Sequence, residues 1–191
     1  MGTLYWWFTF DIMMILKIDP NEVRWFAMSS PYCREMKAKE LLDSHGIKNF
    51  IPMVRKQVVV DDELETKETP AIHNFIFVHD SYNGIMAVKK GLAYLQFILA
   101  PNSPLIVPDR QMSDFIRFYE SGAYQEPEFL DARQMSELRS NAKVVIGDGP
   151  FEGLEGYFQR VTGAKNKRFV ISLDGVMALA CKVECKFVKR K

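Results

Sequence analysis

The sequence predicts a mixed α+β domain followed by a smaller domain made of β-strands. Up to about residue 120, apolar strand-like segments and two amphipathic helices come in the order strand, helix, three strands, helix. This order is typical of an α+β sandwich with both helices packed on the sheet. From residue 143 onward, short apolar segments alternate with glycines, as in a small β-barrel. The length of 191 residues is enough for two such domains.

The composition is that of an ordinary globular protein, with 48% hydrophobic and 26% charged residues. A net charge of +1 gives no overall attraction to nucleic acid, so such binding would depend on a local basic patch. Three cysteines, Cys33, Cys181 and Cys185, are too few for a disulfide framework, and the closely spaced pair lacks further zinc ligands. We therefore interpret them as small apolar residues in a reducing cytosol, and we expect no metal and no cofactor.

The first 18 residues, MGTLYWWFTFDIMMILKI, are unusually apolar. The run is too short to span a bilayer, Asp11 interrupts it, and the features of a signal peptide are missing. Residues 1–23 are either a dispensable extension, disordered or upstream of a true start at Met13 or Met14, or a weakly docked or membrane-touching tail. We favour the first interpretation and expect a cytoplasmic protein without a membrane partner.

The next segments predict the first strand and helix. Residues 24–28 (RWFAM) form a short aromatic strand. Ser30 and Pro31 are suited to begin a helix, and Gly46 is suited to end it after about Ser44.

The two faces of this helix are expected to differ in polarity. Ala38, Leu41 and Leu42 give a narrow apolar stripe. Glu35 and Lys39 are spaced to form an i,i+4 ion pair on the solvent side.

Three further strands and a helix complete the first domain, which we place at residues 24–120. Residues 50–60, 71–80 and 93–99 predict strands. The acidic stretch 61–69 predicts a mobile loop. A helix begins at Asp109, and its apolar residues follow helical spacing: Met112, Phe115, Ile116 and Tyr119.

The polar stretch 121–142 lacks clear periodicity and predicts a linker, so the second domain spans residues 143–191. Its strands are expected at 143–146, 155–161, 168–173, 177–183 and 185–189.

The glycine-rich run 147–156 (GDGPFEGLEG) raises the question of a phosphate-binding loop. A Walker loop needs Gly-Lys-Ser/Thr, which occurs nowhere in the chain. A dinucleotide fingerprint needs a third glycine at position 152, which is a glutamate, and a helix after the run, where a strand is predicted instead. These glycines are therefore expected to form tight turns between strands.

The same run carries a resemblance to a known family. The stretch 144–161 (VVIGDGPFEGLEGYFQRV) resembles the KOW motif of NusG-type transcription factors. Residues 24–47 are similar to the first strand and helix of the NusG N-terminal (NGN) domain, and residues 73–78 and 93–116 to its later strands and last helix. The resemblance implies an NGN α/β sandwich followed by an SH3-like KOW barrel. Its motif residues are Gly149, Pro150, Phe151, Gly153 and Gly156.

Some details resemble specialised paralogues, the UpxY-type antiterminators of Bacteroidetes surface-polysaccharide operons, which are similar to RfaH in role. These details are PAIHNFIFV (70–78) and IVPDRQM (106–112). The housekeeping factor carries Phe-Gly-Arg between its later barrel strands, where this chain has Asp174-Gly175-Val176. This departure puts the ribosomal and termination partners of the general factor in doubt.

The resemblance implies a transcription elongation and antitermination factor whose NGN domain binds the β′ clamp helices of RNA polymerase. The contact is apolar and aromatic. Because strand residues alternate between faces, some of the matching positions must lie in the core instead. The matching positions are Phe26, Phe50, Phe75, Ile76 and Phe77.

Specialised relatives also read the exposed non-template DNA strand with basic residues of the first helix. The matching positions are Arg34, Lys37 and Lys39, which would bind phosphates, with Arg34 also able to stack on a base. A solvated helix face balanced by Glu35 and Glu40 is the alternative.

The KOW domain is basic around Lys165, Lys167 and Arg168. This region is either a face for nascent RNA or a ribosomal or transcription partner, or a solubilising rim. In RfaH the C-terminal domain can form a helical hairpin, and residues 176–184 include good helix formers, but the β-branched stretch before them favours a barrel here.

We expect no enzyme activity, because the three histidines lie in no nucleophile motif. His73 and His79 flank a strand without a third metal ligand, and a Cys33–His45 dyad has no support. The alternatives to an operon-specific antiterminator are a general elongation factor of the NusG type and a ribosomal RNA-binding protein of the KOW class.

Overall fold

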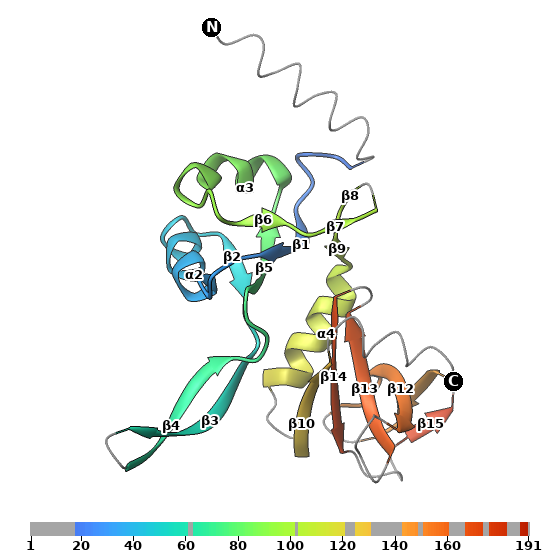
Figure 1. The fold of residues 1–191 in the computed structure, drawn as a ribbon. Coiled ribbons are helices and arrows are strands. Elements are labelled where there is room, and N and C mark those ends of the chain that lie inside the picture. Colours follow the sequence, from blue (N-terminus) through green and yellow to red (C-terminus); the bar gives the residue numbers. More distant parts are fainter. Residues whose placement is uncertain are drawn as a thin grey trace, which may run out of the picture. The chain divides into compact units, whose positions relative to one another are not determined.

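The computed structural model describes residues 18–60, 63–101, 103–120, 125–130, 143–148, 151–160, 167–173, 176–182 and 188–190 (Figure 1). The chain divides into two compact units, one up to Val107 and one from Pro108, and each is described by itself. Residues 1–17 of the expected N-terminal extension lie outside the described residues, as do Gly149, Pro150, Lys165, Asp174 and Gly175.

The first unit is built on a five-stranded sheet in which every pair of neighbours is antiparallel. The strand order is β2 (Lys48–Phe50), β5 (Phe75–Asp80), β1 (Arg24–Ser29) and β6 (Gln96–Phe97). A further strand, β9 (Ile106–Val107), pairs with the first half of β1, whereas β6 pairs with its last residues. The predicted aromatic strand is thus confirmed, and the structure places it in the middle of the sheet.

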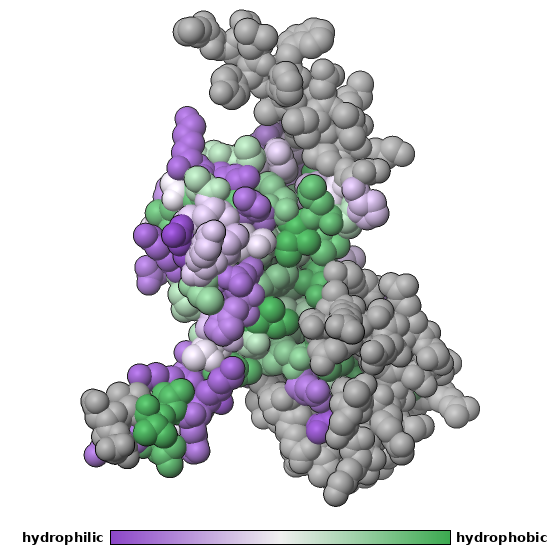
Figure 2. Space-filling model, viewed as in Figure 1, coloured by the Kyte–Doolittle hydropathy of each residue, from purple (hydrophilic) through white to green (hydrophobic). Residues whose placement is uncertain are grey.

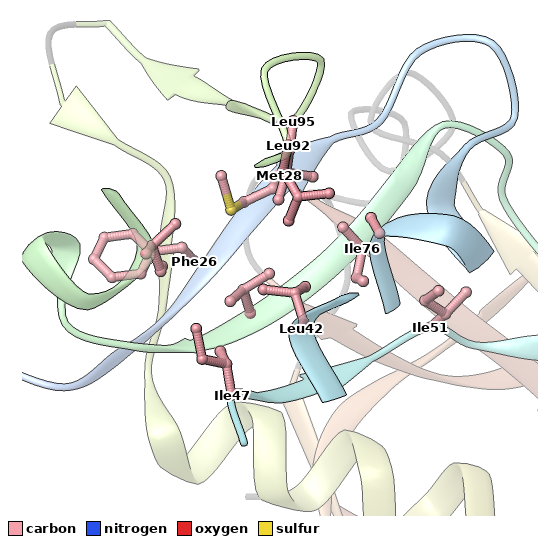
Figure 3. Packing of buried hydrophobic residues seen from close by; sticks show 11 residues of the cluster. Phe26, Met28, Leu42, Ile47, Ile51, Ile76, Leu92 and Leu95 are labelled. Atoms are coloured by element: carbon pink, nitrogen blue, oxygen red, sulfur yellow. The ribbon is translucent and has the colours of Figure 1, made fainter. Parts of the chain in front are cut away.

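Two helices, α2 (Glu35–Ser44) and α3 (Tyr82–Val88), contribute to the core on one face of this sheet. Phe26 and Met28 of β1 are fully buried there with Ile76 of β5 and Leu42 of α2 (Figure 3). Ile85 of α3 is fully buried in the same core. Burying a side chain of this size contributes about 1.5–3 kcal/mol each. This core fixes the orientation of α2 and therefore of the residues at its N-terminus.

The opposite face of the sheet is aromatic. Phe77 lies opposite Ala27 and Phe50 in the strand register, so these residues share a face that points away from α2. Trp25 packs against His79 with ring centroids 4.7 Å apart. Trp25, Ala27 and Phe77 are buried, which explains why β1 reads as one continuous apolar run rather than an alternating one.

The helix α2 begins later than predicted, at Glu35 rather than near Ser30. Tyr32 and Cys33 adopt positive φ angles of 64° and 53°, which no helix can contain. The predicted ion pair is also wrong. Glu35 is buried and contacts His73, and Lys39 instead pairs with Asp43 at 2.9 Å.

The other end of α2 is as predicted. Gly46 has a φ of 70°, and the backbone N–H of Ile47 donates to the carbonyl of Leu42 after the last turn. Ala38 and Leu42 are buried, and Leu41 packs against the same core.

A long hairpin replaces the predicted loop at 61–69. Its strands β3 (Met53–Val60) and β4 (Glu63–Pro70) pair throughout and project from the sheet (Figure 1). Cross-strand pairing overrides the charged composition of β4, and Arg55 lies 3.0 Å from Glu68. The predicted strand 50–60 is interrupted at Pro52, which has no N–H to donate to a ladder.

The remaining strands of the first unit are shorter than predicted. Within 71–80 the strand begins at Phe75, because residues 71–74 form a turn in which Asn74 has a φ of 62°. Within 93–99 the sheet strand is limited to β6, and a small excursion follows, made of β7 (Leu99–Ala100) and β8 (Ser103–Pro104). This excursion returns the chain to β1 as β9.

The second unit contains α4 (Asp109–Glu120) and a six-stranded antiparallel sheet. Four of the five predicted strands are confirmed, the one expected at 185–189 is described only from Val188, and a sixth, β10, lies within the range 121–142 where we expected a linker. Leu130 of β10 is fully buried beside β14, so a distant partner rather than local periodicity forms this strand. In sheet order the strands are β10 (Gln125–Leu130), β14 (Met177–Lys182), β13 (Lys167–Leu173), β12 (Glu155–Arg160), β11 (Lys143–Ile146) and β15 (Val188–Arg190).

The helix α4 packs on the sheet of the second unit. Phe118 is fully buried, with ring centroids 4.7 Å from Phe151 and 6.0 Å from Phe169. The buried stripe is Met112, Phe115 and Phe118, whereas the predicted Ile116 and Tyr119 lie beside it and are half-buried.

The glycine-rich run forms a turn between β11 and β12, as predicted. Gly153 has a φ of 82°, and its N–H donates to the carbonyl of Ile146. Gly156 is needed for another reason, since a Cβ there would lie 2.5 Å from the carbonyl oxygen of Val170 and 2.6 Å from the ring of Phe169. Both glycines therefore have structural roles, in a turn and in close packing.

Among the described residues, the helices are too short or too polar to cross a lipid bilayer.

Candidate functional site

A cluster of two tyrosines and an arginine, in which Tyr32 and Arg34 are exposed and Tyr94 is half-buried, lies at the N-terminus of α2. The guanidinium carbon of Arg34 is 5.5 Å from the ring centre of Tyr32 and 5.2 Å from that of Tyr94. Tyr32 is 83% exposed, because its left-handed backbone turns the side chain outward before the helix begins. The cluster therefore presents a flat cation and an aromatic ring together at the surface.

A hollow of about 370 Å³ lies beside this cluster. One wall is the exposed side of α2, with Lys37 and Glu40, and the other is the segment after α3, with Gly91 and Tyr94. Gly91 allows a close approach, since a Cβ at this position would lie 3.1 Å from Leu41. The hollow has a cation at its rim and an aromatic ring in its wall, which suits an unstacked base and its phosphate.

Local electrostatics differ between the two lysines of α2. Lys39 donates to Asp43 at 2.9 Å, and this hydrogen bond, with a second one from Asn49, lowers the pKa of Asp43. Burial raises the pKa of the Tyr94 hydroxyl, and the charge of Arg34 acts in the opposite direction. Lys37 is exposed, and among the described residues no salt bridge joins it or Arg34 to a carboxylate.

The three predicted DNA-binding residues thus lie on one helix but in different settings. Arg34 and Lys37 face the cluster and the hollow, whereas Lys39 is half-buried in its ion pair. Sequence reasoning missed Tyr32 and Tyr94. Tyr32 stands two residues before Arg34, so an aromatic residue close to a basic residue at the start of a helix could have indicated the cluster. Tyr94 has no such signal in the sequence, because only the fold brings it to Arg34.

The five predicted polymerase-binding positions fall on the two faces of the sheet. Phe26 and Ile76 are fully buried in the core beneath α2 and α3. Phe50, Phe75 and Phe77 lie on the aromatic face, and Phe77 packs against Phe75 at 4.7 Å and Phe50 at 6.4 Å between ring centroids. Phe50 is half-buried and gives this group its accessible edge.

The predicted basic face of the second unit is only partly described. Lys165 lies outside the described residues, and Lys167 is the first residue of β13. The side chain of Arg168 is 15% exposed, and its Nε is 4.0 Å from Glu128 Oε2. Arg168 is therefore directed at a carboxylate of β10 rather than at solvent.

The polar groups elsewhere show how the charges are paired. A pocket of about 190 Å³ between α4 and the sheet of the second unit is lined by Arg110, Asp114 and Glu155, and the arginine lies within 4.0 Å of each carboxylate.

The dyad Cys33–His45 does not form, because His45 follows the last residue of α2 and Cys33 precedes the helix. The ring of His45 contacts the carbonyl of Leu41 instead.

These features define a class of protein. It has an α+β unit with helices on one face of an antiparallel sheet, an aromatic opposite face and an aromatic–cation cluster, followed by a β-rich unit (Figure 1). Surfaces of this kind are suited to binding macromolecules.

The comparisons identify the family of the first part. Residues 23–116 match the family model described as "Transcription termination factor nusG", so the chain contains a NusG-family domain. NusG-family proteins are transcription factors. Among solved structures, the chain is similar to one reported as "Domain interaction in Thermotoga maritima NusG", with a TM-score of 0.44 and 17% identity over 90% of this chain and 99% of that chain. A search of curated proteins finds no significant match.

Proposed function

We propose that this chain is a transcription elongation and antitermination factor of the cytoplasm that acts by binding RNA polymerase and not by catalysis. The match of residues 23–116 to the NusG family model is the observation that carries the proposal. The α+β unit, which ends at Val107 and so holds most of this match, also carries the aromatic face and the aromatic–cation cluster.

The aromatic face of the sheet is the proposed contact for the β′ clamp helices of the polymerase. Phe50 supplies the accessible edge, and Phe75 and Phe77 pack behind it. Large aromatic anchors supported by a rigid sheet are the usual centre of a binding interface. Phe26 and Ile76 contribute from the core on the other face, where they fix the strands that carry these anchors.

The cluster at the N-terminus of α2 is the proposed contact for the exposed non-template DNA strand. Arg34 and Lys37 would bind phosphates, and Tyr32, Arg34 and Tyr94 offer planar groups on which a base can stack. The pairing of Lys39 with Asp43 makes it a weaker contributor.

The resemblance of residues 70–78 and 106–112 to UpxY-type antiterminators supports a role at one operon, such as one for surface or capsular polysaccharide. The second unit would then carry a partner-binding surface of the KOW type, for nascent RNA or a ribosomal protein, in which Lys165 and Lys167 take part. The ion pair of Arg168 with Glu128 makes it a structural member of that unit.

The test is transcription elongation in vitro by the cognate polymerase, with one template that carries the leader of the neighbouring operon and one that does not. The proposal expects increased read-through with the leader, and a loss of this increase for Arg34→Ala combined with Lys37→Ala. Arg117→Ala is a matched control because it removes a cation from α4 in the other unit.

Other outcomes separate the alternatives. Read-through on both templates would indicate a general elongation factor. The absence of an effect together with no polymerase binding would overturn the proposal and favour an RNA-binding protein of the ribosomal KOW class.

A further inference from the structure

Three side chains of metal-ligand type meet where the turn before α2 contacts the turn between β4 and β5. Cys33 precedes α2, Glu35 is its first residue, and His73 lies two residues before β5. A thiol sulfur, a carboxylate oxygen and a ring nitrogen from these residues all lie within 4.8 Å of one another. Glu35 and His73 are 38 positions apart in the sequence, so the fold and not a sequence motif creates this group.

The carboxylate in this group lacks a partner that its burial requires. The side chain of Glu35 is 2% exposed, and its Oε1 lies 3.2 Å from Nδ1 of His73. Its Oε2 is buried and has no hydrogen-bond partner. A buried carboxylate is stable when it is paired or coordinates a cation, and here one of its two oxygens has neither.

The backbone holds the thiol in place independently of any ligand. The N–H of Cys33 donates to Oδ1 of Asn74 at 2.8 Å, and the N–H of Ser30 donates to the carbonyl of Asn74 at 2.9 Å. Tyr32, Cys33 and Asn74 all have positive φ angles, which are unfavourable for a tyrosine or a cysteine and are tolerated by asparagine. Both turns are therefore fixed in unusual conformations that bring the thiol beside His73.

From these observations we propose that Cys33, Glu35 and His73 bind a divalent transition-metal ion, with Zn²⁺ as the preferred ion and a water in the fourth position. Thiolate, imidazole and carboxylate are the three ligand types that Zn²⁺ accepts. Bond lengths of about 2.0–2.3 Å in a tetrahedral site place ligand atoms roughly 3.3–3.6 Å apart. The 3.2 Å between Glu35 and His73 is close to this spacing, and the thiol sulfur lies within 4.8 Å of both ligand atoms.

The ion would connect the turn before α2, which carries Tyr32 of the aromatic–cation cluster, to the turn between β4 and β5. The half-exposed His73 and the exposed Cys33 give it access from solvent. The inference does not rest on the proposed function, because metal binding is measured on the chain by itself.

The test is a titration of the full-length, reduced, chelator-treated protein with Co²⁺, followed by displacement with Zn²⁺. The expected result is one ion per chain with the charge-transfer absorption of a cobalt–thiolate bond. Cys33→Ser should abolish this absorption. Loss of a residue that only hydrogen-bonds to a metal ligand lowers metal affinity roughly 10–100-fold. Both Cys33→Ser and His73→Gln remove a ligand itself, so they should weaken binding by at least this factor.

The control variants replace a cysteine and a histidine that lie outside the proposed metal site. Cys181→Ser and His79→Gln should leave the absorption and the affinity unchanged. Glu35→Gln tests the third ligand, and because it is buried, circular dichroism must first show a native fold. The absence of saturable binding, or an absorption that survives Cys33→Ser and disappears in Cys181→Ser, would overturn the inference.

Discussion

The salt dependence of DNA binding tests the proposed cluster at the N-terminus of α2 most directly. Each cation that neutralises a phosphate of single-stranded DNA contributes about 0.7 to the slope of log K against log salt concentration. Among the described residues no salt bridge holds Arg34 or Lys37, so each is expected to contribute a full contact. Arg34→Gln and Lys37→Gln should each lower the slope by about 0.7, and together by about 1.4.

The structure predicts a different result for the third cation of the helix. Lys39 is bound to Asp43 at 2.9 Å and must leave this pair to reach a phosphate. Lys39→Gln should therefore change the slope by clearly less than either of the other two variants.

Stacking can be separated from charge in the same experiment. Tyr32→Leu removes an aromatic ring that is 83% exposed, so the fold should tolerate it. Loss of a stacked base costs about 1–3 kcal/mol, or roughly 5–150-fold in affinity, with little change in the slope.

The assay is fluorescence anisotropy of a labelled single strand from the operon leader, between about 50 and 200 mM salt. Arg117→Gln in the second unit serves as the control and should leave the slope unchanged. A slope that falls as much for Lys39→Gln as for Arg34→Gln, or that falls for neither, would refute the assignment of this cluster.

Three further predictions concern stability and the hairpin. Gly156→Ala should destabilise the second unit by at least about 1–3 kcal/mol in urea unfolding, because its Cβ would lie 2.5 Å from a carbonyl oxygen; an unchanged midpoint would contradict this packing. The pKa of Asp43 is lowered in the folded state. Its contribution to the free energy of unfolding is therefore present above the pKa of the unfolded chain and is lost as pH falls through the folded pKa. Asp43→Asn should therefore cost up to about 0.5 kcal/mol at neutral pH and progressively less as the pH falls below the unfolded pKa of about 3.9, as measured by urea unfolding across this range, and a cost that does not change with pH would count against it. Val59→Thr with Leu64→Thr should change the thermal midpoint little, since these apolar side chains are 67% and 71% exposed, and a clear drop would show that the hairpin packs elsewhere.

Much of the fold could be predicted because its strands and helices carry their own periodicity. The aromatic run at 24–28, the apolar spacing from Asp109 and the glycine-separated strands after residue 143 each reflect burial along one segment. Segments whose structure depends on a distant partner could not be predicted. The charged strand β4 exists because β3 pairs with it, and β10 exists because β14 does.

The candidate site shows the same limit. The basic residues of α2 were visible in the sequence, but the role of Glu35 was not. A glutamate in the first turn of a helix normally faces solvent, and the contact with His73 from the turn before β5 reverses this. The positive φ angles of Tyr32 and Cys33 also have no local sequence signature, since neither residue is a glycine or an asparagine.

The hairpin β3–β4 has a consequence for how such a protein can change over evolutionary time. Along both strands the side chains described are exposed or half-buried until Pro70 at the base, and Figure 2 shows hydrophobic surface near the tip. Met53 at the base packs against the core beneath α2 and α3, but substitutions, insertions and deletions farther along this arm leave that core intact. A family built on this sheet can alter the length and chemistry of the arm, and so the partner it reaches, while folding stability stays nearly constant.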